Sequence, residues 1–455
     1  MNQRTAASIA LAFAAASLMS WQSVSAYQDS VPLFWALALA MLLASFQAYR
    51  CANAIKNWHV FSLAALLHAV ALLGQPMFED DYFRYLWDGY QSVENGTPYG
   101  PAPEYYFSDP QVPKRMQTVL SCVNNPDIPT LYGPAVQHVF ALAYRFSAGS
   151  ERTLRSLFAL LHLVLIGLLL RAEKFVENPL LGAGEKMSSP VLLYVLNPLV
   201  FKEVALTGHF DFLVPMGLIA AWLCLHKGRA LFAGVCLSLA IASKIIAVLA
   251  LPLLVWPLLH RAHYGKLGGL LLASILSLAL LYWPFVSDLG AGLLPGDLAG
   301  LKAFSSDWRF NAGVFALLEF ISEPLARGFA AFAVVAMLAF YTQRAKTSLA
   351  AFASAAAAVF STLILLGPVI NPWYWLWVLP LACLTRWRWP FWVSGALLLS
   401  YGHGLFNQDA DAYALPLWLQ VVEHGIIAMM ILAGVFLNCT TGGRDSCIYF
   451  ELYPK

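Results

Sequence analysis

The sequence predicts an all-α protein, a polytopic bundle of transmembrane helices. Of its 455 residues, 60% are hydrophobic and 11% are charged, less than half the roughly 25% of charged residues in a soluble domain. The apolar residues gather in stretches of roughly 14 to 22, about the length that crosses a hydrocarbon core as a helix. These stretches lack the alternating polarity of transmembrane β-barrel strands, so a helical bundle is the architecture that we expect.

Apolar segments recur along the whole chain, and two polar stretches separate them. The first, 75–130, follows the third segment, and the second, 286–311, follows the tenth. A short polar tail, 440–455, ends the chain. We expect one integral membrane domain over 1–455, with 75–130 as a long non-cytoplasmic loop. The predicted helices cover 6–21, 31–46, 61–74, 131–146, 154–170, 190–200, 212–225, 231–242, 245–259, 267–285, 312–321, 329–341, 349–366, 373–384, 390–405 and 415–437.

The N-terminus combines Arg4, an apolar run and a small-residue stretch over 23–26, which is the arrangement of a cleaved signal peptide. A retained first helix is the alternative that we favour. Either outcome leaves the chain outside before the second helix.

Basic residues of the short connections predict the orientation. Cytoplasmic loops carry an excess of Lys and Arg, and placing these connections inside leaves 75–130 outside. One region resists, because two apolar segments lie where an odd number of crossings is required. We expect the first, 131–146, to lie along the interface or re-enter, which leaves three arginines, Arg155 among them, outside. The basic connections carry Arg50, Lys56, Arg171, Lys174, Lys227, Arg229, Arg261, Lys266, Arg344, Lys346, Arg386 and Arg388.

Charge and cysteine usage exclude other classes. The net charge is +2 and the basic residues stand singly or in pairs, so nothing predicts a nucleic-acid surface. The seven cysteines are scattered without metal-ligand spacing, so we expect no disulfide framework.

Three carboxylates, Glu79, Asp80 and Asp81, stand side by side directly after the third helix. Adjacent carboxylates repel one another, which raises the proton affinity of at least one of them unless a cation offsets it. Such a cluster suits a general base whose neighbour holds the substrate or a metal. A solvated acidic loop is the plain alternative. Aromatic residues favour a sugar site, although they also populate membrane interfaces; they are Tyr82, Phe83, Tyr85 and Trp87.

A second group of ionisable residues crowds one junction between apolar segments. Such residues are costly inside a bundle and face a polar interior or a site. A structural pairing, of Lys202 with Glu203 or of His209 with Asp211, is the alternative. Lys244 stands in a long apolar stretch without a carboxylate nearby in sequence, so we expect its partner to be an anion of the substrate.

Two further motifs lie in the second half of the chain. Arg309 offers a planar, permanently charged fork suited to phosphate. Over 367–375, two prolines break a spanning helix and leave backbone groups that must line a cavity or be covered by protein. Asn371, Trp373 and Tyr374 follow this break. Aromatic anchoring at the interface is the alternative account of the last two.

Together these motifs resemble the GT-C-type polyprenyl-phosphate-sugar glycosyltransferases, especially the bacterial mannosyltransferase-like members. The family pattern of aspartates, then Arg-Tyr-Leu-Trp-Asp-Gly, then Gly-x-Asn-Pro-Tyr is similar to 80–89 and 96–99. Thr97 stands where Asn is common and Gly133 where a second Pro is usual, which leaves the subfamily open. The other similar motifs, in the family's order, are 131–136, 197–200, 208–211, 308–311 and 371–374.

The resemblance implies a GT-C helical bundle in a bacterial plasma membrane, with its active site on the periplasmic or outer face. It implies a one-step inverting transfer, in which an acceptor hydroxyl attacks the anomeric carbon of mannose or another hexose and polyprenyl phosphate leaves. Since phosphate leaves as a stable anion, cations suffice to hold the developing charge. The acceptor, a glycan, a lipid or a protein, stays open.

Residue roles follow from the same resemblance. Asp80 or Asp81 is the expected base, and both suit a divalent ion such as Mg²⁺ or Mn²⁺. The expected substrate-binding residues are Glu79, Arg84, Asp88, Lys202, His209, Asp211, Lys244, Arg309, Asn371, Trp373 and Tyr374.

Two other functions fit the composition. Buried charges and proline-broken helices also build the pathway of a transporter or flippase for lipid-linked sugars. Against it stand the absence of inverted halves and the concentration of polar groups on one face. An oligosaccharide ligase that uses a polyprenyl diphosphate is the other alternative.

Overall fold

The computed structural model describes residues 2–52, 55–176, 189–285, 297–344, 348–403 and 415–441. Within these ranges the chain is helical apart from turns and an isolated β-bridge between Phe310 and Val369, so the predicted all-α class is confirmed. The expected tail lies, from residue 442 onward, outside the described residues, as does 286–296 of the second polar stretch.

The described residues form α-helices, 3₁₀-helices and a π-helix. The α-helices are α1 (Gln3–Gln22), α2 (Val31–Cys51), α3 (Asn57–Ala71), α4 (Asp81–Glu94), α5 (Lys114–Leu120), α6 (Pro134–Phe146), α7 (Glu151–Ala172), α8 (Pro190–Val195), α9 (Pro198–Val200), α10 (Leu213–His226), α11 (Ala230–Ser243), α12 (Leu251–His260), α13 (Tyr264–Tyr282), α14 (Asp297–Asp307), α15 (Gly313–Glu319), α16 (Glu323–Gln343), α17 (Leu349–Leu365), α18 (Leu379–Ala382), α19 (Trp389–Leu397) and α21 (Leu417–Thr441). The 3₁₀-helices are η1 (Pro103–Tyr106), η2 (Glu173–Phe175), η4 (Ile245–Ala250), η5 (Trp283–Phe285), η7 (Pro372–Trp377) and η8 (Leu398–Gly402), and η3 (Phe201–Thr207) is a π-helix.

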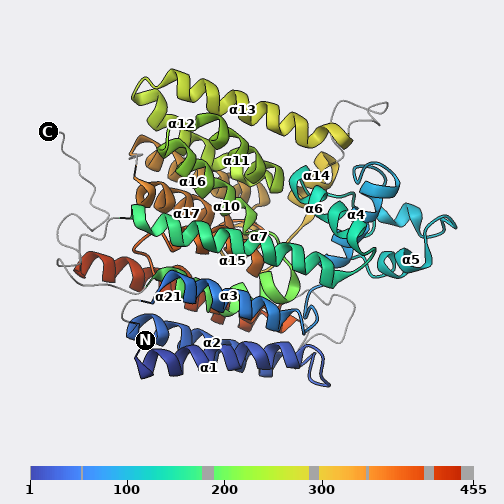
Figure 1. Ribbon diagram of the computed structural model, residues 1–455, viewed down its shortest axis with the longest axis horizontal. Helices are drawn as coiled ribbons and strands as arrows, with labels where there is room; N and C mark the ends of the chain where they lie inside the picture. Colours follow the sequence, from blue (N-terminus) through green and yellow to red (C-terminus); the bar gives the residue numbers. More distant parts are fainter. Residues whose placement is uncertain are drawn as a thin grey trace.

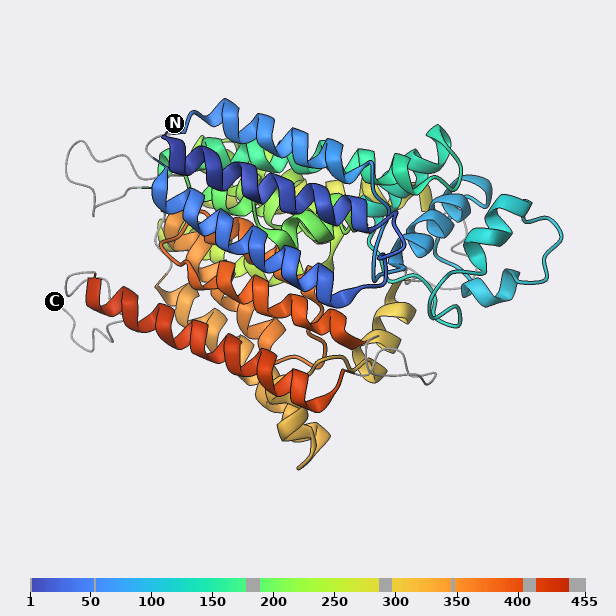
Figure 2. The same ribbon diagram turned by 90° about the horizontal axis from the view of Figure 1, so that it is seen from below.

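Most helices run along the longest dimension of the molecule (Figure 1). At one end, which we call the terminal end, α1 begins and α21 ends (Figures 1 and 2). The end of α2, the start of α3 and the connection from α12 to α13 lie there too. The opposite end, which we call the loop end, gathers α4, α5 and α6.

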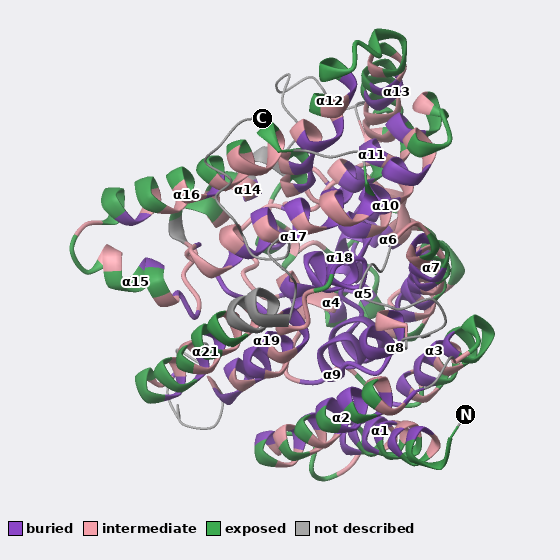
Figure 3. Ribbon diagram, turned by 90° about the vertical axis from the view of Figure 1, so that its left-hand side faces the viewer, coloured by how far each residue is buried: buried purple, intermediate pink, exposed green. Residues whose placement is uncertain are grey.

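Six described helices, α1, α2, α7, α13, α16 and α21, are long and apolar enough to cross a membrane. Shorter apolar helices, α3, α10, α11, α17 and the continuous η4–α12, accompany them. Exposed side chains cover the outer helices α13 and α16, while α8, α9 and α18 at the centre are buried (Figure 3). A surface of apolar side chains such as Leu280, 71% exposed, suits hydrocarbon rather than water. The chain is a polytopic helical membrane protein.

A broken helix forms the centre of the bundle. Pro198 cannot continue the hydrogen bonds of α8, and the Asn197 side chain accepts hydrogen bonds from the next two free amides at 3.0 and 3.4 Å. The chain then continues as the π-helix η3, so the predicted segment 190–200 extends to Thr207. Gly208 ends it with φ of +90°, a conformation that favours glycine. Short π-helices are frequent at functional sites.

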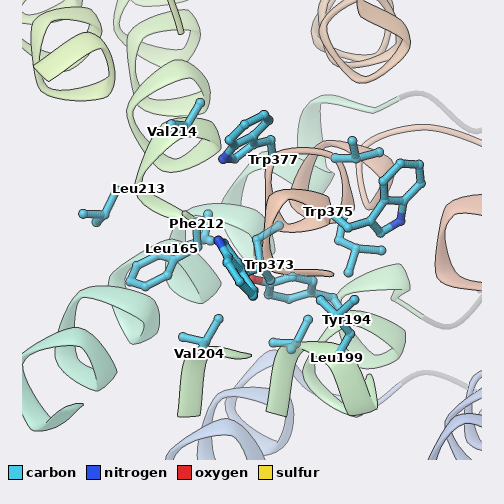
Figure 4. Packing of buried hydrophobic residues seen from close by; sticks show 14 of the residues in the cluster. Leu165, Tyr194, Leu199, Val204, Phe212, Leu213, Val214, Trp373, Trp375 and Trp377 are labelled. Carbon is cyan, nitrogen blue, oxygen red and sulfur yellow. The ribbon is translucent and has the colours of Figure 1, made fainter. Parts of the chain in front are cut away.

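The second half of the chain meets this centre through η7. Trp373, Trp375 and Trp377 pack among buried residues of α8, α9, η3 and α10 (Figure 4). The residues that follow the predicted helix break at Pro368 and Pro372 are therefore part of the protein core.

The expected loop over 75–130 contains α4, η1 and α5. Hydropathy alone does not predict α4, because this helix is short and half polar. Its apolar residues Tyr85, Leu86 and Tyr90 nevertheless lie on one helical face. The α4 helix packs closely on α6. A Cβ atom on Gly89 would lie 2.5 Å from the carbonyl oxygen of Phe140, so this approach requires glycine.

The α6 helix lies beside α4 at the loop end and does not cross the bundle (Figure 1). This is one of the two expected arrangements for 131–146, and it leaves α7 as the single crossing. Arg155 of α7 is buried and donates to the carbonyls of Ala71, Gly74 and Leu206 at 3.0, 2.8 and 3.1 Å. It ties the end of α3 to the end of η3.

Candidate active site

Glu79, Asp80 and Asp81 lie between α3 and the first turn of α4, at the loop end. Asn124, which follows α5, donates through Nδ2 to Asp80 Oδ1 at 2.6 Å and to Asp81 Oδ1 at 2.9 Å. Phe78 has φ of +62°, a strained conformation of a kind that clusters at functional sites. The acids are therefore held by protein contacts and do not form a freely solvated loop.

His209 connects these acids to the π-helix η3. Its Nε2 lies 3.7 Å from Asp81 Oδ2, and its Nδ1 donates to Glu203 Oε2 at 2.9 Å. Its ring stacks on Trp373, with centroids 4.4 Å apart and planes 6° from parallel. The pairing with Asp211 that the sequence left open is absent from the contacts of the described residues, and Glu203 and Asp81 take its place.

The charges of this cluster are coupled. Burial raises the pKa of Glu79 to about 8, against the opposing charge of Lys202. Burial also acts to raise the pKa of Asp81, but His209 outweighs it and holds that pKa below its ordinary value. Burial acts to lower the pKa of His209, but Asp81 and Glu203 raise it to about 9. At neutral pH, Glu79 therefore holds a proton beside the ion pair of Asp81 and His209, chiefly because it is buried and to a smaller extent because Asp81 is negatively charged.

Lys202 is buried and engaged by the protein itself. Its Nζ donates to the Tyr401 hydroxyl at 2.6 Å and lies 3.4 Å from Glu203 Oε2. The Tyr401 hydroxyl in turn donates to Glu203 Oε1. We call Lys202, Glu203 and Tyr401 the buried triad. The structural pairing of Lys202 with Glu203, the alternative to a substrate contact, is the one that the structure shows.

Lys244 has a carboxylate partner, which corrects the expectation that its partner comes with the substrate. Its Nζ donates to Asp211 Oδ1 at 2.6 Å, and Trp377 Nε1 donates to the same oxygen at 2.8 Å. The pair is 33 residues apart in sequence, and the packing of α10 on α11 brings it together. The ammonium also lies 4.5 Å above the Tyr374 ring, a cation–π contact. With 16% of its side chain exposed, Lys244 stays within reach of a ligand.

Arg84 and Asp88 of α4 are bound to each other and to the segment that leads into α6. Arg84 Nε lies 3.5 Å from Asp88 Oδ1, and Arg84 donates to the Ile128 carbonyl. Asp88 accepts hydrogen bonds from Thr130 and Gln137. These contacts hold α4 against the segment that leads into α6.

Arg309 belongs to a separate network. It donates to Glu319 and Glu323 at 2.8 Å each, and none of its described hydrogen bonds or ion pairs reaches the acidic cluster. The structure therefore does not bring Arg309 together with His209 and Lys244.

The next residue, Phe310, connects this network to the proline break. Its amide donates to the Pro368 carbonyl at 3.1 Å, and its carbonyl accepts from the Ile370 amide at 2.9 Å. Backbone groups freed by the prolines are thus covered by protein, as expected. The bridge fixes the turn that carries Asn371, which is buried, into η7. Trp373 and Tyr374 contact His209 and Lys244, so interfacial anchoring does not describe them.

Four contributors were not among the expected site residues. Glu203 belongs to the ionisable group in the sequence, where it stands between the basic residues Lys202 and His209. That placement is the signal that points to it. Amide and aromatic side chains are common in such chains, so the sequence carries no signal for the others, which are Asn124, Trp377 and Tyr401.

Adjacent aspartates suit a divalent ion, so the groups around Asp80 and Asp81 can be compared with the ligands that such an ion takes. Such ions take six or more oxygen ligands. Within the described ranges, no group of three or more His, Cys, Asp or Glu residues is arranged to hold a metal. The Asn124 amide, a donor, instead faces both Asp80 and Asp81. A divalent ion at Asp80 and Asp81 stays a prediction, because Mg²⁺ needs only one or two carboxylates beside water and substrate phosphates.

Comparison with known proteins identifies the family. A family model described as alpha-(1->6)-mannopyranosyltransferase, N-terminal domain, matches residues 5–260, more than half of the chain. The match includes the acids, η3 and Lys244, while Trp373, Tyr374 and Tyr401 join the site from beyond it. No curated protein was found to match the chain. The resemblance to mannosyltransferases is confirmed, and the chain belongs to the alpha-(1->6)-mannopyranosyltransferase family, a family of glycosyltransferases.

Proposed function

We propose that this membrane glycosyltransferase moves a single mannose from a polyprenyl-phosphate carrier to a hydroxyl of a glycan acceptor, with inversion, on the non-cytoplasmic face. One observation carries the proposal. The carboxylate of Asp81 faces the imidazolium of His209 at 3.7 Å, at one end of a bundle whose sides are apolar. A lipid-borne donor can reach such a site without leaving the membrane.

Chemistry at this site needs a base and cations. Asp81 takes the proton of the acceptor hydroxyl, whose oxygen forms a bond to the anomeric carbon while the bond from that carbon to the phosphate oxygen breaks. Polyprenyl phosphate leaves as an anion and needs no strong acid, and His209 and Lys244 stabilise its charge. Asp80, with Asn124, holds Asp81 in place. Neighbouring Glu79, protonated at neutral pH, adds no further negative charge.

Stereochemistry narrows the donor. The family's printed description names an alpha-(1->6) linkage. If this chain makes the same bond with inversion, then the mannose of its donor is β-linked to phosphate and the acceptor offers a primary 6-hydroxyl. The basic connections at the terminal end favour the cytoplasm for that end, which supports the outer face of a bacterial plasma membrane for the loop end.

Transfer can be measured directly. Protein purified in detergent and returned to lipid is given polyprenyl-phosphate mannose labelled in the sugar, together with a short mannan. We expect label to move from lipid to glycan, and the double substitution Asp80→Asn, Asp81→Asn to abolish this with unchanged thermal unfolding. Asp127→Asn, an exposed acid of the same region, is the matched control and stays active.

Other outcomes separate the alternatives. Full activity of the double variant would end the assignment of the base. Label that crosses vesicles but stays on the lipid would indicate a transporter or flippase, and transfer only from a polyprenyl diphosphate glycan would indicate a ligase.

A further inference from the structure

Glu203 holds His209 at two points. The His209 amide donates to the Glu203 carbonyl at 2.7 Å, and the His209 ring donates through Nδ1 to Glu203 Oε2 at 2.9 Å. Gly208 makes the tight return possible through its positive φ of 90°. Backbone and side chain of one residue therefore fix both the position and the rotation of the imidazole.

Glu203 is itself immobilised by the rest of the buried triad. Its second oxygen accepts from the Tyr401 hydroxyl, and Lys202 Nζ binds that hydroxyl at 2.6 Å. Glu203 and Lys202 are 0% exposed. Charges buried in this way persist only with paired partners. Tyr401 comes from η8, 198 residues along the chain from Glu203.

The remaining freedom of the ring is removed by Trp373, which stacks on its face. Nε2 is then directed at Asp81 Oδ2, 3.7 Å away, and it is buried without a hydrogen-bond partner among the described residues. This distance is beyond hydrogen-bond range. Contacts of this kind in ligand-free sites shorten when substrate binds.

We propose that Glu203 and Tyr401 are positioning residues of the transferase reaction. They hold His209 so that its Nε2–H points at the carboxylate that takes the acceptor proton, and they touch no substrate themselves. The inference rests on the proposed function, because it gives Asp81 that role. Charged and titratable groups around the imidazole and its two carboxylate partners come from the acidic segment, α4, η3, the residue after α11 and η8; they are Glu79, Asp81, Tyr85, Lys202, Glu203, Lys244 and Tyr401.

Tyr401→Phe distinguishes a positioning role of Tyr401 from a role in packing alone. Loss of the hydroxyl frees one oxygen of Glu203 and loosens the imidazole, while the packing of the ring is kept. We expect kcat to fall roughly 10- to 100-fold, the cost of a misplacement near 1 Å, with the KM for the lipid donor within about twofold of wild type, since positioning acts in the transition state.

Tyr194→Phe is the matched control. Tyr194 is equally buried, and its hydroxyl bonds to His162 Nε2 at 2.7 Å, away from the acids. Tyr194→Phe loses one buried hydrogen bond, whereas Tyr401→Phe loses two that involve charged groups. Both variants should therefore be destabilised, Tyr401→Phe the more, while the kcat of Tyr194→Phe per folded molecule stays at the wild-type value. A merely structural role would give both variants the same kcat.

Glu203 adds a rescue test. Glu203→Gln keeps a carbonyl that accepts from Nδ1, whereas Glu203→Leu keeps none, so the Gln variant should retain more kcat per folded molecule. Equal loss in both variants would overturn the positioning role.

A readout independent of transfer separates the two proposals. In protein labelled with ¹⁵N-histidine, the His209 signal, assigned by its loss in His209→Gln, should shift in Tyr401→Phe and stay in place in Tyr194→Phe. An unmoved signal with wild-type kcat overturns the inference. Wild-type protein that transfers no mannose, with a His209 signal that still responds to Tyr401, overturns the proposed function alone and leaves the positioning geometry in force.

Discussion

Asp81 and Asp80 accept hydrogen bonds from the same Asn124 amide, and Asp81 in addition faces the imidazolium of His209. We therefore predict that Asp81→Asn lowers kcat by roughly 10²- to 10⁴-fold, the usual contribution of a general base. Asp80→Asn should lower it less, because Asp80 acts through Asp81. Initial rates of mannose transfer measure both, and a larger loss for Asp80→Asn would exchange the two roles.

Glu79 gives a second prediction at this scale, on stability against pH. The ordinary pKa of its carboxyl is 4.5, and burial raises it to about 8 in the folded protein. The folded state then binds this proton more tightly, so the stabilisation is complete below pH 4.5 and is lost as the pH rises through 8. The melting temperature of the wild type should fall relative to Glu79→Gln over this window. Parallel curves for the two proteins would show that the Glu79 pKa is not raised.

Helix α4 begins at Asp81, directly after the other two acids. The packing of α4 on α6 therefore determines where the acids lie relative to the bundle. Gly89 allows this approach, since a Cβ would meet the Phe140 carbonyl oxygen at 2.5 Å. We predict that Gly89→Ala destabilises the protein by about 1–3 kcal/mol, as overpacking does, and lowers transfer. Gly100→Ala, in the same region with nothing within 4 Å of its Cβ, is the control. Equal melting temperatures for both variants would contradict this packing.

Hydropathy alone does not predict whether a short apolar segment crosses the membrane. The segment 131–146 is apolar enough to pass for a crossing, yet it lies across the loop end as α6. Contact with α4 decides its place, because each of these two amphipathic helices covers the apolar face of the other.

Across the whole molecule, the alternation of helices puts the two ends on opposite sides of the membrane. We predict that Cys122, exposed near the acids, reacts with a membrane-impermeant maleimide in intact cells when the other cysteines are replaced by serine. In a cysteine-free background, Lys56→Cys, exposed between α2 and α3, should react only after permeabilisation. Labelling of both positions from one side would refute the topology and the outer-face site.

The sequence by itself determined the helical membrane class, most spanning segments, the acidic cluster and the family, because length, hydropathy and motif order are local properties of the chain. Only the tertiary structure decided which charges meet. Lys244 pairs with Asp211 and Glu203 with Tyr401 because buried charges require partners, and helix packing alone determines which distant side chain is near enough to be one.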